Sequence, residues 1–327
     1  MTPMAARHPR LAAGTTAPRD GGAALERALE RIMSLQDGDQ GVLDVVACGQ
    51  EAIPRLRHLL FRREPSGLYQ PRCRVVEALA ALGAQDVLRA FVDTDREIND
   101  PVERAGEEAV LNTAVRALRG EDDEAFFQRL LELASTRRLA GAIELLGTFR
   151  RPEALSCLIA ALADDLARMA AEDAIRQYGR AAETALLAGA TERIMQDGAE
   201  TESSRRRRRA ALGLLLEIGG AAGLSRQQRD AWCLDDDPWI ALAGCRLALA
   251  CGAPAERCAA IRRLLDMLPA VDWQVRRDIE DCLIEHGDDA RPLIRAAVPA
   301  VAPDATDFSR QAEAQRCLIR LARRIGN

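Results

Sequence analysis

DDLARMAAEDAIRQYGRAAETALLAGA, residues 164–190, contains one complete structural unit of this chain. Its first half places apolar side chains at the i, i+3, i+4, i+7 spacing of one helical face, which predicts a helix ending at Tyr178. Gly179 follows, and a glycine at this point accepts the left-handed conformation without a Cβ penalty. Ala185 and Leu186 then belong to the apolar stripe of a second helix. The stretch therefore predicts two helices joined by a glycine turn.

Similar helix–glycine–helix units recur along the chain, with their glycines 27 to 40 residues apart. We expect the first helix of each unit to end at Gly49, Gly83, Gly120, Gly147, Gly179, Gly219, Gly252, Gly287 and Gly326. A repeat of this period is typical of an α-solenoid, in which each hairpin buries its apolar face against the next. No stretch alternates apolar and polar residues long enough to predict a strand. We predict an all-α fold: a right-handed α-solenoid of about eight hairpins over residues 23–327, after a disordered leader at residues 1–22.

The composition excludes several classes of function. Hydrophobic residues make up 48% of the chain and aromatic residues only 3%, which suits closely packed helices with small side chains. The net charge of −5 gives no overall attraction for nucleic acid or anionic membranes. Every basic residue is arginine, so the lysine of a P-loop, of a Schiff-base enzyme or of a kinase is absent.

The cysteines and the apolar runs indicate the compartment. Nine cysteines occur singly, without a C-x-x-C motif, as expected for reduced core residues in a cytosolic protein. No apolar run approaches the ~20 residues that span a bilayer, and residues 1–22 lack the apolar segment of a secretory signal. We therefore expect a cytoplasmic protein that does not enter a membrane.

Several local motifs resemble a known repeat family. They are the acidic residue that opens a first helix (Asp164 and Asp272), the Val275–Arg276 step, and the turns GQEAIPRL at 49–56 and GDDARPLI at 287–294. Over residues 42–326 the chain resembles HEAT repeats, most closely the short bacterial repeats related to those of phycobilin lyases. Proteins of this family mostly bind other macromolecules, so the resemblance implies a fold and a binding role more than an activity.

Two features attract attention as possible sites. The run Arg205–Arg209 is either a contact for phosphate, nucleic acid or an acidic partner, or a solvated helix start; we favour the latter, because consecutive residues point to all sides of a helix. Trp239 and Trp273 stand near the starts of first helices in adjacent repeats. HEAT-type DNA glycosylases would place aromatic, aspartate and arginine side chains on a concave surface, but we favour packing or partner contact for these tryptophans.

The acidic pairs and the histidines do not predict catalysis. Carboxylates cluster at expected helix starts, where capping and the helix dipole favour them over acid–base or metal chemistry. These clusters are Asp122–Asp123, Asp164–Asp165, Asp235–Asp237 and Asp288–Asp289. His58 has no Cys, Ser or Asp partner at a motif spacing, and His286 falls in the last turn of its expected helix, where a histidine suits the C-terminal dipole. We predict no catalytic residue, no cofactor and no metal site.

The sequence favours a non-enzymatic scaffold or adaptor that binds a protein partner on a concave face lined by the second helices. Its mixture of arginines and acidic residues suits a protein surface more than a polyanion. The long segment 62–70 is either a binding loop or a simple insertion. A HEAT-like lyase or enzyme accessory subunit acting on a protein-attached group remains an alternative, as does a DNA glycosylase or DNA-binding protein. The expected partner-binding residues are Arg55, Arg62, Arg63, Tyr69, Arg151, Arg180, Trp239, Arg262 and Trp273.

Overall fold

The computed structural model of the protein describes residues 21–62, 70–220, 223–298 and 309–326, together with Asp304 and Asp307. The leader predicted at residues 1–22 lies outside this range, except for its last two residues, which begin the first helix. The chain forms two compact units, one ending at Glu121 and one beginning at Asp122. Each unit has its own buried apolar side chains, and the single solenoid over residues 23–327 stays a prediction.

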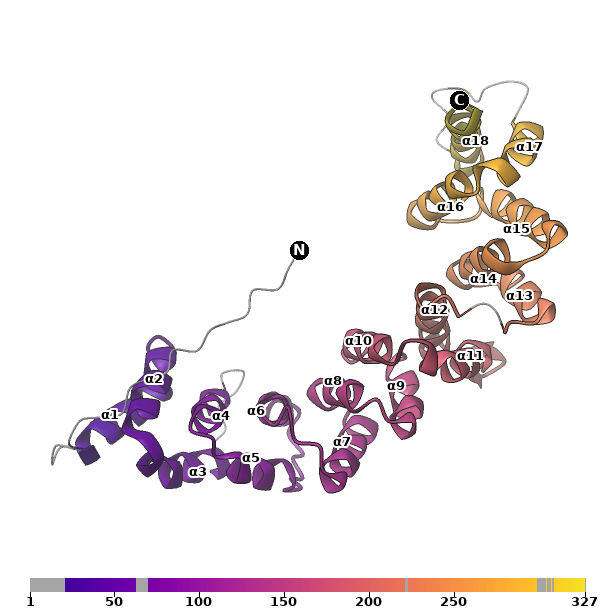
Figure 1. Ribbon diagram of the computed structural model, residues 1–327. Coiled ribbons are helices and arrows are strands. Elements are labelled where there is room, and N and C mark those ends of the chain that lie inside the picture. The colour runs from indigo at the N-terminus through magenta and orange to yellow at the C-terminus, as the bar shows by residue number, and fades with distance from the viewer. Residues whose placement is uncertain are drawn as a thin grey trace. The chain divides into compact units, whose positions relative to one another are not determined.

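The described residues of unit 1 form helices joined by short connections (Figure 1). Its elements are α1 (Gly21–Ile32), α2 (Gly38–Cys48), the 3-10 turn η1 (Gly49–Ala52), α3 (Ile53–Phe61), α4 (Arg72–Ala81), α5 (Gln85–Val92) and α6 (Pro101–Ala117). Helices α2, α4 and α6 pack on one another in that order, while α3 and α5 pack against α4 and α6. Val45, Leu79 and Val110 are fully buried between them, because each helix turns one apolar face inward.

Unit 2 continues the same alternation. Its elements are α7 (Glu124–Thr136), α8 (Ala140–Phe149), η2 (Pro152–Ala154), α9 (Leu155–Ala161), α10 (Arg168–Tyr178), η3 (Gly179–Ala182), α11 (Glu183–Thr191), β1 (Met195–Gln196), β2 (Ala199–Glu200), α12 (Glu202–Glu217), α13 (Arg226–Cys233), α14 (Pro238–Cys251), α15 (Pro254–Met267), α16 (Trp273–Glu285), α17 (Gly287–Ala297) and α18 (Arg310–Gly326). The prediction of an all-α protein is therefore confirmed.

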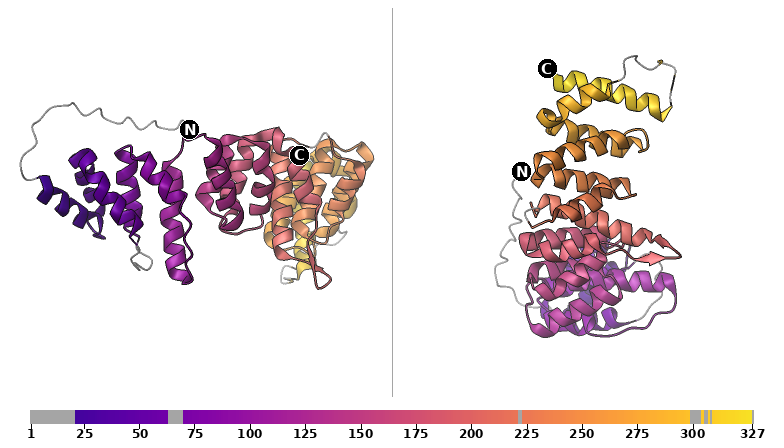
Figure 2. Two further views of the ribbon diagram at one scale, coloured as in Figure 1. Left: turned by 90° about the horizontal axis from the view of Figure 1, so that it is seen from below. Right: turned by 90° about the vertical axis from the view of Figure 1, so that its right-hand side faces the viewer.

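The even-numbered helices of unit 2 form a row, since each of α8 to α18 packs on the next even-numbered helix. Each odd-numbered helix returns the chain in the opposite direction before the next even-numbered helix. The even-numbered helices therefore all begin at one edge of unit 2 (Figure 2). We call this the entry edge. It consists of the connections α9–α10, α11–α12, α13–α14 and α15–α16, with the first turn of each helix that follows. The hairpin β1–β2 projects at this edge (Figure 2).

The prediction that the chain holds no strand is wrong at this hairpin. Met195 pairs with Glu200 and Gln196 with Ala199 in antiparallel register. The two residues between the strands, Asp197 and Gly198, both have positive φ, 52° and 80°. Asp-Gly at such a turn is a strong hairpin signal, but strands of two residues are too short to show alternation.

The central unit folds as predicted: α10 ends at Tyr178, and Gly179 follows with φ 54°. Positive φ also occurs at the predicted positions Gly49, Gly83, Gly120 and Gly219. The prediction is wrong at Gly147, which lies inside α8; Arg150 ends that helix instead, with φ 52°. Glycine is present there because a Cβ on Gly147 would lie 2.7 Å from the Cα of Ala174 in α10.

Gly252 and Gly326 stand at helix ends as predicted, whereas Gly287 does not end a helix. Gly252 follows α14 but has an extended conformation, with φ −78°. Gly287 begins α17, and Gly326 is the last residue of α18. Spacing alone does not distinguish a glycine that ends a helix from one that permits close packing.

Carboxylates cap the helices as predicted. Each capping side chain accepts hydrogen bonds at 2.9–3.2 Å from backbone N–H groups two or three residues further on, which have no partner within the helix. The capping residues are Asp123, Asp237 and Asp272, whereas Asp164 accepts in the same way from the turn before α10, whose own N-cap is Ala167. Within the described part of the chain, no helix is long and apolar enough to span a bilayer.

Candidate functional site

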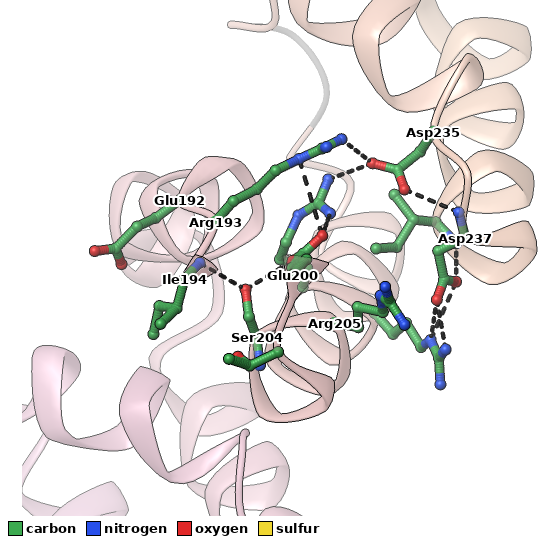
Figure 3. Close-up of polar contacts among 12 residues, drawn as sticks. Glu192, Arg193, Ile194, Glu200, Ser204, Arg205, Asp235 and Asp237 are labelled. Carbon is green, nitrogen blue, oxygen red and sulfur yellow. Dashed lines mark hydrogen bonds and ion pairs between the residues drawn. The ribbon is translucent and has the colours of Figure 1, made fainter. Parts of the chain in front are cut away.

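The five consecutive arginines lie in the first turns of α12, on the entry edge of unit 2. Thr201 caps this helix by accepting a hydrogen bond from the N–H of Ser204 at 3.2 Å. Glu202 and Arg205 are 3.8 Å apart, and both side chains are exposed. The other four arginines reach carboxylates on different segments of unit 2, and Figure 3 shows part of this network.

Arg208 is the centre of the network. Its side chain is 1% exposed, and its three nitrogen atoms donate to three different acceptors. The Nε donates to the carbonyl of Ala190 at 2.9 Å, Nη1 to Glu200 at 2.9 Å and Nη2 to Asp235 at 2.6 Å. A guanidinium that is this deeply buried is stable only when its charge and its donors are compensated, and here they are.

Arg206 and Arg207 connect α12 to the two preceding connections. Arg206 contacts the carboxylate of Asp165 at 2.8 Å and donates to the carbonyl of Ala163 at 3.1 Å. Arg207 contacts the carboxylate of Glu192 at 3.1 Å and donates to its carbonyl at 2.9 Å. Both arginines therefore satisfy carbonyl groups that follow the ends of α9 and α11, where no further helical N–H is available.

Arg209 connects α12 to the connection that follows it. Two of its nitrogen atoms donate to Asp237, and this bonding raises the pKa of the guanidinium. Asp237 also caps α14, so a single carboxylate joins the starts of two neighbouring helices. Asp235, close by, accepts from Arg193 at 2.5 Å and from the backbone N–H of Asp237 at 3.0 Å (Figure 3).

We call Arg205–Arg209 and their partners the arginine clamp. The clamp joins the connections α9–α10, α11–α12 and α13–α14 to the start of α12. The favoured sequence interpretation, a solvated helix start, is wrong for Arg207 and Arg208, which are buried. The partners Asp235 and Asp237 lie in the next repeat, 27 and 28 residues from the arginines they bind. The run of three aspartates at residues 235–237, one repeat after the arginine run, is a sequence signal that could have suggested these ion pairs.

Exposed apolar side chains gather on the same edge. In the described part of unit 2, all six large apolar residues that are exposed belong to the four connections of the entry edge or to the helix turn that follows. The most exposed are Leu166, at 93%, and Met169, at 72%. We call the six the apolar edge: Leu166, Met169, Ile194, Met195, Leu234 and Trp273.

The clamp and the apolar edge are neighbours in the sequence. Leu166 follows the clamp residue Asp165, and Leu234 precedes Asp235. Ile194 follows Arg193, which contacts Asp235. Each of these apolar side chains is therefore attached to backbone that a buried or partly buried ion pair holds in place.

A separate arginine holds the connection before Trp273. Arg276, 8% exposed, donates to the carbonyl of Leu268 at 3.2 Å and to that of Val271 at 3.1 Å. It also contacts Glu313 of α18 at 2.6 Å. The fourth connection is thus fixed by the same kind of contact as the other three.

A cleft of about 510 Å³ lies between the hairpin and the α13–α14 connection. Arginines and carboxylates line it together: Arg193, Arg205, Arg209, Glu200, Asp235, Asp236 and Asp237. Most of these charges already bind one another, so the cleft presents a balanced surface rather than a single sign. Among the described residues, no group of three or more His, Cys, Asp or Glu side chains is placed to hold a metal ion.

The partner-binding residues predicted from the sequence occupy several different places. In unit 1, Arg55 is exposed and contacts Glu26 at 2.6 Å, and Arg62 is exposed just after α3. Arg63 and Tyr69 lie outside the described residues. The structure therefore does not group these four residues into one site.

In unit 2 the predicted residues also separate. Arg180 is exposed in η3, which leads into α11, and Arg262 is exposed on α15. We call the surface formed by the odd-numbered helices and the turns that lead into them the odd-numbered side. Arg151 contacts Glu124, and its guanidinium lies 4.4 Å from the ring centre of Phe127.

The two tryptophans differ in exposure although both begin an even-numbered helix. Trp239 is half-buried against the apolar core of α13–α18 and lines a small groove with Arg209, Leu216 and Arg246. Trp273 is 71% exposed and belongs to the apolar edge. Of the predicted set, Trp273 alone lies on that edge.

Comparison with known proteins does not assign the chain to a family. No protein-family model matches it, and no curated protein matches it significantly. The resemblance to HEAT repeats stays a prediction from the sequence.

Proposed function

We propose that this protein is a non-enzymatic scaffold or adaptor whose apolar edge in unit 2 binds a protein partner. We further propose that its hairpins form a right-handed α-solenoid of the HEAT type and that it works in the cytoplasm. Partner binding on a concave face, as expected from the sequence, stays a prediction. The exposed side chains and ion pairs of unit 2 favour the entry edge as the binding surface.

One observation carries this proposal: in the described part of unit 2, the exposed large apolar side chains all lie on consecutive connections of one edge, or in the helix turn that follows. Single exposed apolar residues are ordinary, but their concentration in one region is typical of an interaction surface. Leu166, Leu234 and Trp273 are 93%, 70% and 71% exposed, so most of each side chain is available to a partner. Burying one such side chain contributes about 1.5–3 kcal/mol.

The arginine clamp supports the proposal because it makes the edge rigid before binding. Loops that must be ordered on association lose affinity through conformational entropy. Here Asp165, Arg193 and Asp235 fix the backbone beside three of the apolar side chains. The partner therefore needs apolar side chains spaced to match successive helix starts, surrounded by both signs of charge.

A nucleic-acid partner is less well supported. The arginine run, which would have supplied phosphate contacts, is bound to carboxylates of the same chain. Beside Trp239, Arg209 binds Asp237, and Arg246 donates to the carbonyl of Asp278 at 3.2 Å. The carboxylate of Asp237 therefore neutralises Arg209, which weakens the case for a phosphate contact beside Trp239.

The test compares two surfaces of unit 2 by affinity capture from the native host. The edge variant carries Leu166→Ser, Leu234→Ser and Trp273→Ser; the matched control carries Arg180→Ser and Arg262→Ser, on the odd-numbered side. We expect the wild type and the control to capture the same protein at near-equal stoichiometry and the edge variant to lose it. The proposal would be contradicted if the edge variant still captured that protein, or if the wild type captured no protein that the edge variant loses.

A further inference from the structure

A groove lies between α9 and α11 of unit 2, and one of its ends reaches the clamp residues Glu192 and Arg207. Its volume is about 570 Å³, which lies within the range of small-molecule sites. Its walls are mostly small and apolar, among them Leu155, Ala160, Ala185 and Ala188. We call this the α9–α11 groove.

The groove owes its form to one close contact at its floor. A Cβ on Gly189 would lie 2.5 Å from the Cγ2 of Ile159, so only glycine lets α11 approach α9 this closely. Small alanines above this contact then leave a channel along both helices. Within α11 the lining runs from Thr184 to Gly189, five helical steps or about 7.5 Å, and Ala181 in η3 and Glu192 after the helix extend it at either end.

One end of the groove is charged. Arg207 lines it with a side chain that is 9% exposed, and its Nε is buried without a hydrogen-bond partner. Its other contacts are to Glu192, through the carbonyl at 2.9 Å and the carboxylate at 3.1 Å. The side chain of Glu192 is 67% exposed, so an anion at this end can displace its carboxylate at little cost.

We propose that the α9–α11 groove binds an amphipathic carboxylate, a free medium-chain fatty acid, with its chain between the helices and its carboxylate on Arg207. The apolar channel suits a hydrocarbon chain, because its walls are mostly alanine, leucine and isoleucine side chains. The planar guanidinium matches a carboxylate in geometry and charge, and burial among apolar walls strengthens that contact. This binding is independent of the apolar edge and does not rest on the protein partner.

The test is calorimetric titration of the full-length protein with decanoate and with uncharged decan-1-ol. We expect saturable binding of one decanoate per chain, at least about tenfold tighter than binding of the alcohol, since one charged hydrogen bond contributes about 1.5–3 kcal/mol. Arg207→Gln removes this difference and leaves binding of the alcohol within about twofold. Glu192→Gln removes the competing carboxylate and tightens decanoate binding.

Two tryptophan variants test the location. Ala188 is exposed and lines the groove, so Ala188→Trp fills the channel and abolishes binding of both ligands. Ala259, exposed on α15, provides the matched control, and Ala259→Trp leaves both affinities unchanged. Circular dichroism checks that each variant is folded; Glu192 and Ala188 are exposed, so their variants test the site even where Arg207→Gln unfolds.

Three results would overturn the proposal. They are the absence of saturable decanoate binding by the wild type, weaker binding by Glu192→Gln, and undiminished binding by Ala188→Trp. Tighter binding of a peptide that ends in a leucine carboxylate than of decanoate would also overturn it, because the occupant would then be a protein terminus. Loss of the apolar-edge partner has no bearing on these outcomes, which keeps the two proposals separable.

Discussion

Replacing Arg208 with methionine tests whether the arginine clamp holds unit 2 together. The substitution keeps the length and packing of the side chain but removes the donors to Ala190, Glu200 and Asp235. The two carboxylates, with side chains 8% and 3% exposed, then lie buried without their main cation. Breaking a buried ion pair from one side typically costs about 3–5 kcal/mol.

The lower end of that range applies here. Asp235 keeps Arg193 and the backbone N–H of Asp237 as donors, so it is only partly uncompensated. We expect Arg208→Met to destabilise unit 2 by about 3 kcal/mol. With a urea dependence of about 2–3 kcal/mol per molar, the unfolding midpoint falls by about 1–1.5 M.

Intrinsic fluorescence is a suitable assay, because all three tryptophans of the chain, Trp232, Trp239 and Trp273, lie in unit 2. Arg205→Met is the control: its partner is 3.8 Å away and both side chains are exposed, so the midpoint should scarcely change. The triple variant Arg208→Met, Glu200→Gln, Asp235→Asn leaves fewer buried charges without a partner and should regain much of the loss. A midpoint for Arg208→Met that matches the Arg205→Met control would refute the stabilising role of the clamp.

Two further substitutions test the packing of α8 against α10. Burial raises the pKa of Tyr178 to about 12, so its hydroxyl ionises first in the unfolded chain, near pH 10. The contribution of Tyr178 to the free energy of unfolding should therefore be fully present below pH 10 and be lost between about pH 10 and 12. In unfolding titrations over this pH range, Tyr178→Phe should make the decline in stability shallower. Gly147→Ala forces its methyl group against Ala174 and should lower the free energy of unfolding by about 1–3 kcal/mol. Gly213→Ala, on α12 with open space around it, is the control and should raise thermal stability. Equal effects of the two substitutions would contradict the packing account.

The helices were predictable from the sequence because their signals are local. Apolar spacing and the glycine at 179 suffice to place α10 and α11, and Asp272 caps its helix as the sequence indicates, whereas Asp164 binds the turn before α10. Gly147 was misassigned because its role depends on Ala174, 27 residues away, which spacing within one helix does not reveal.

The candidate site was harder to predict for the same reason. The run Arg205–Arg209 looks like a solvated or anion-binding segment until the carboxylates of neighbouring repeats are placed beside it. The apolar edge consists of residues that are far apart in the sequence, such as Leu166 and Trp273, and that share one edge only because the even-numbered helices all begin there. No pattern within one repeat distinguishes these exposed side chains from core residues.

Photo-crosslinking in the native host tests the central claim most directly. A photoreactive phenylalanine analogue is placed singly at Leu166, Leu234 or Trp273 on the apolar edge, and at Arg180 or Arg262 on the odd-numbered side. The account predicts that the three edge positions crosslink to one and the same protein and that the two others do not. Crosslinks to a protein from Arg180 and Arg262, with none from the edge, would contradict it and place the partner on the surface predicted from the sequence.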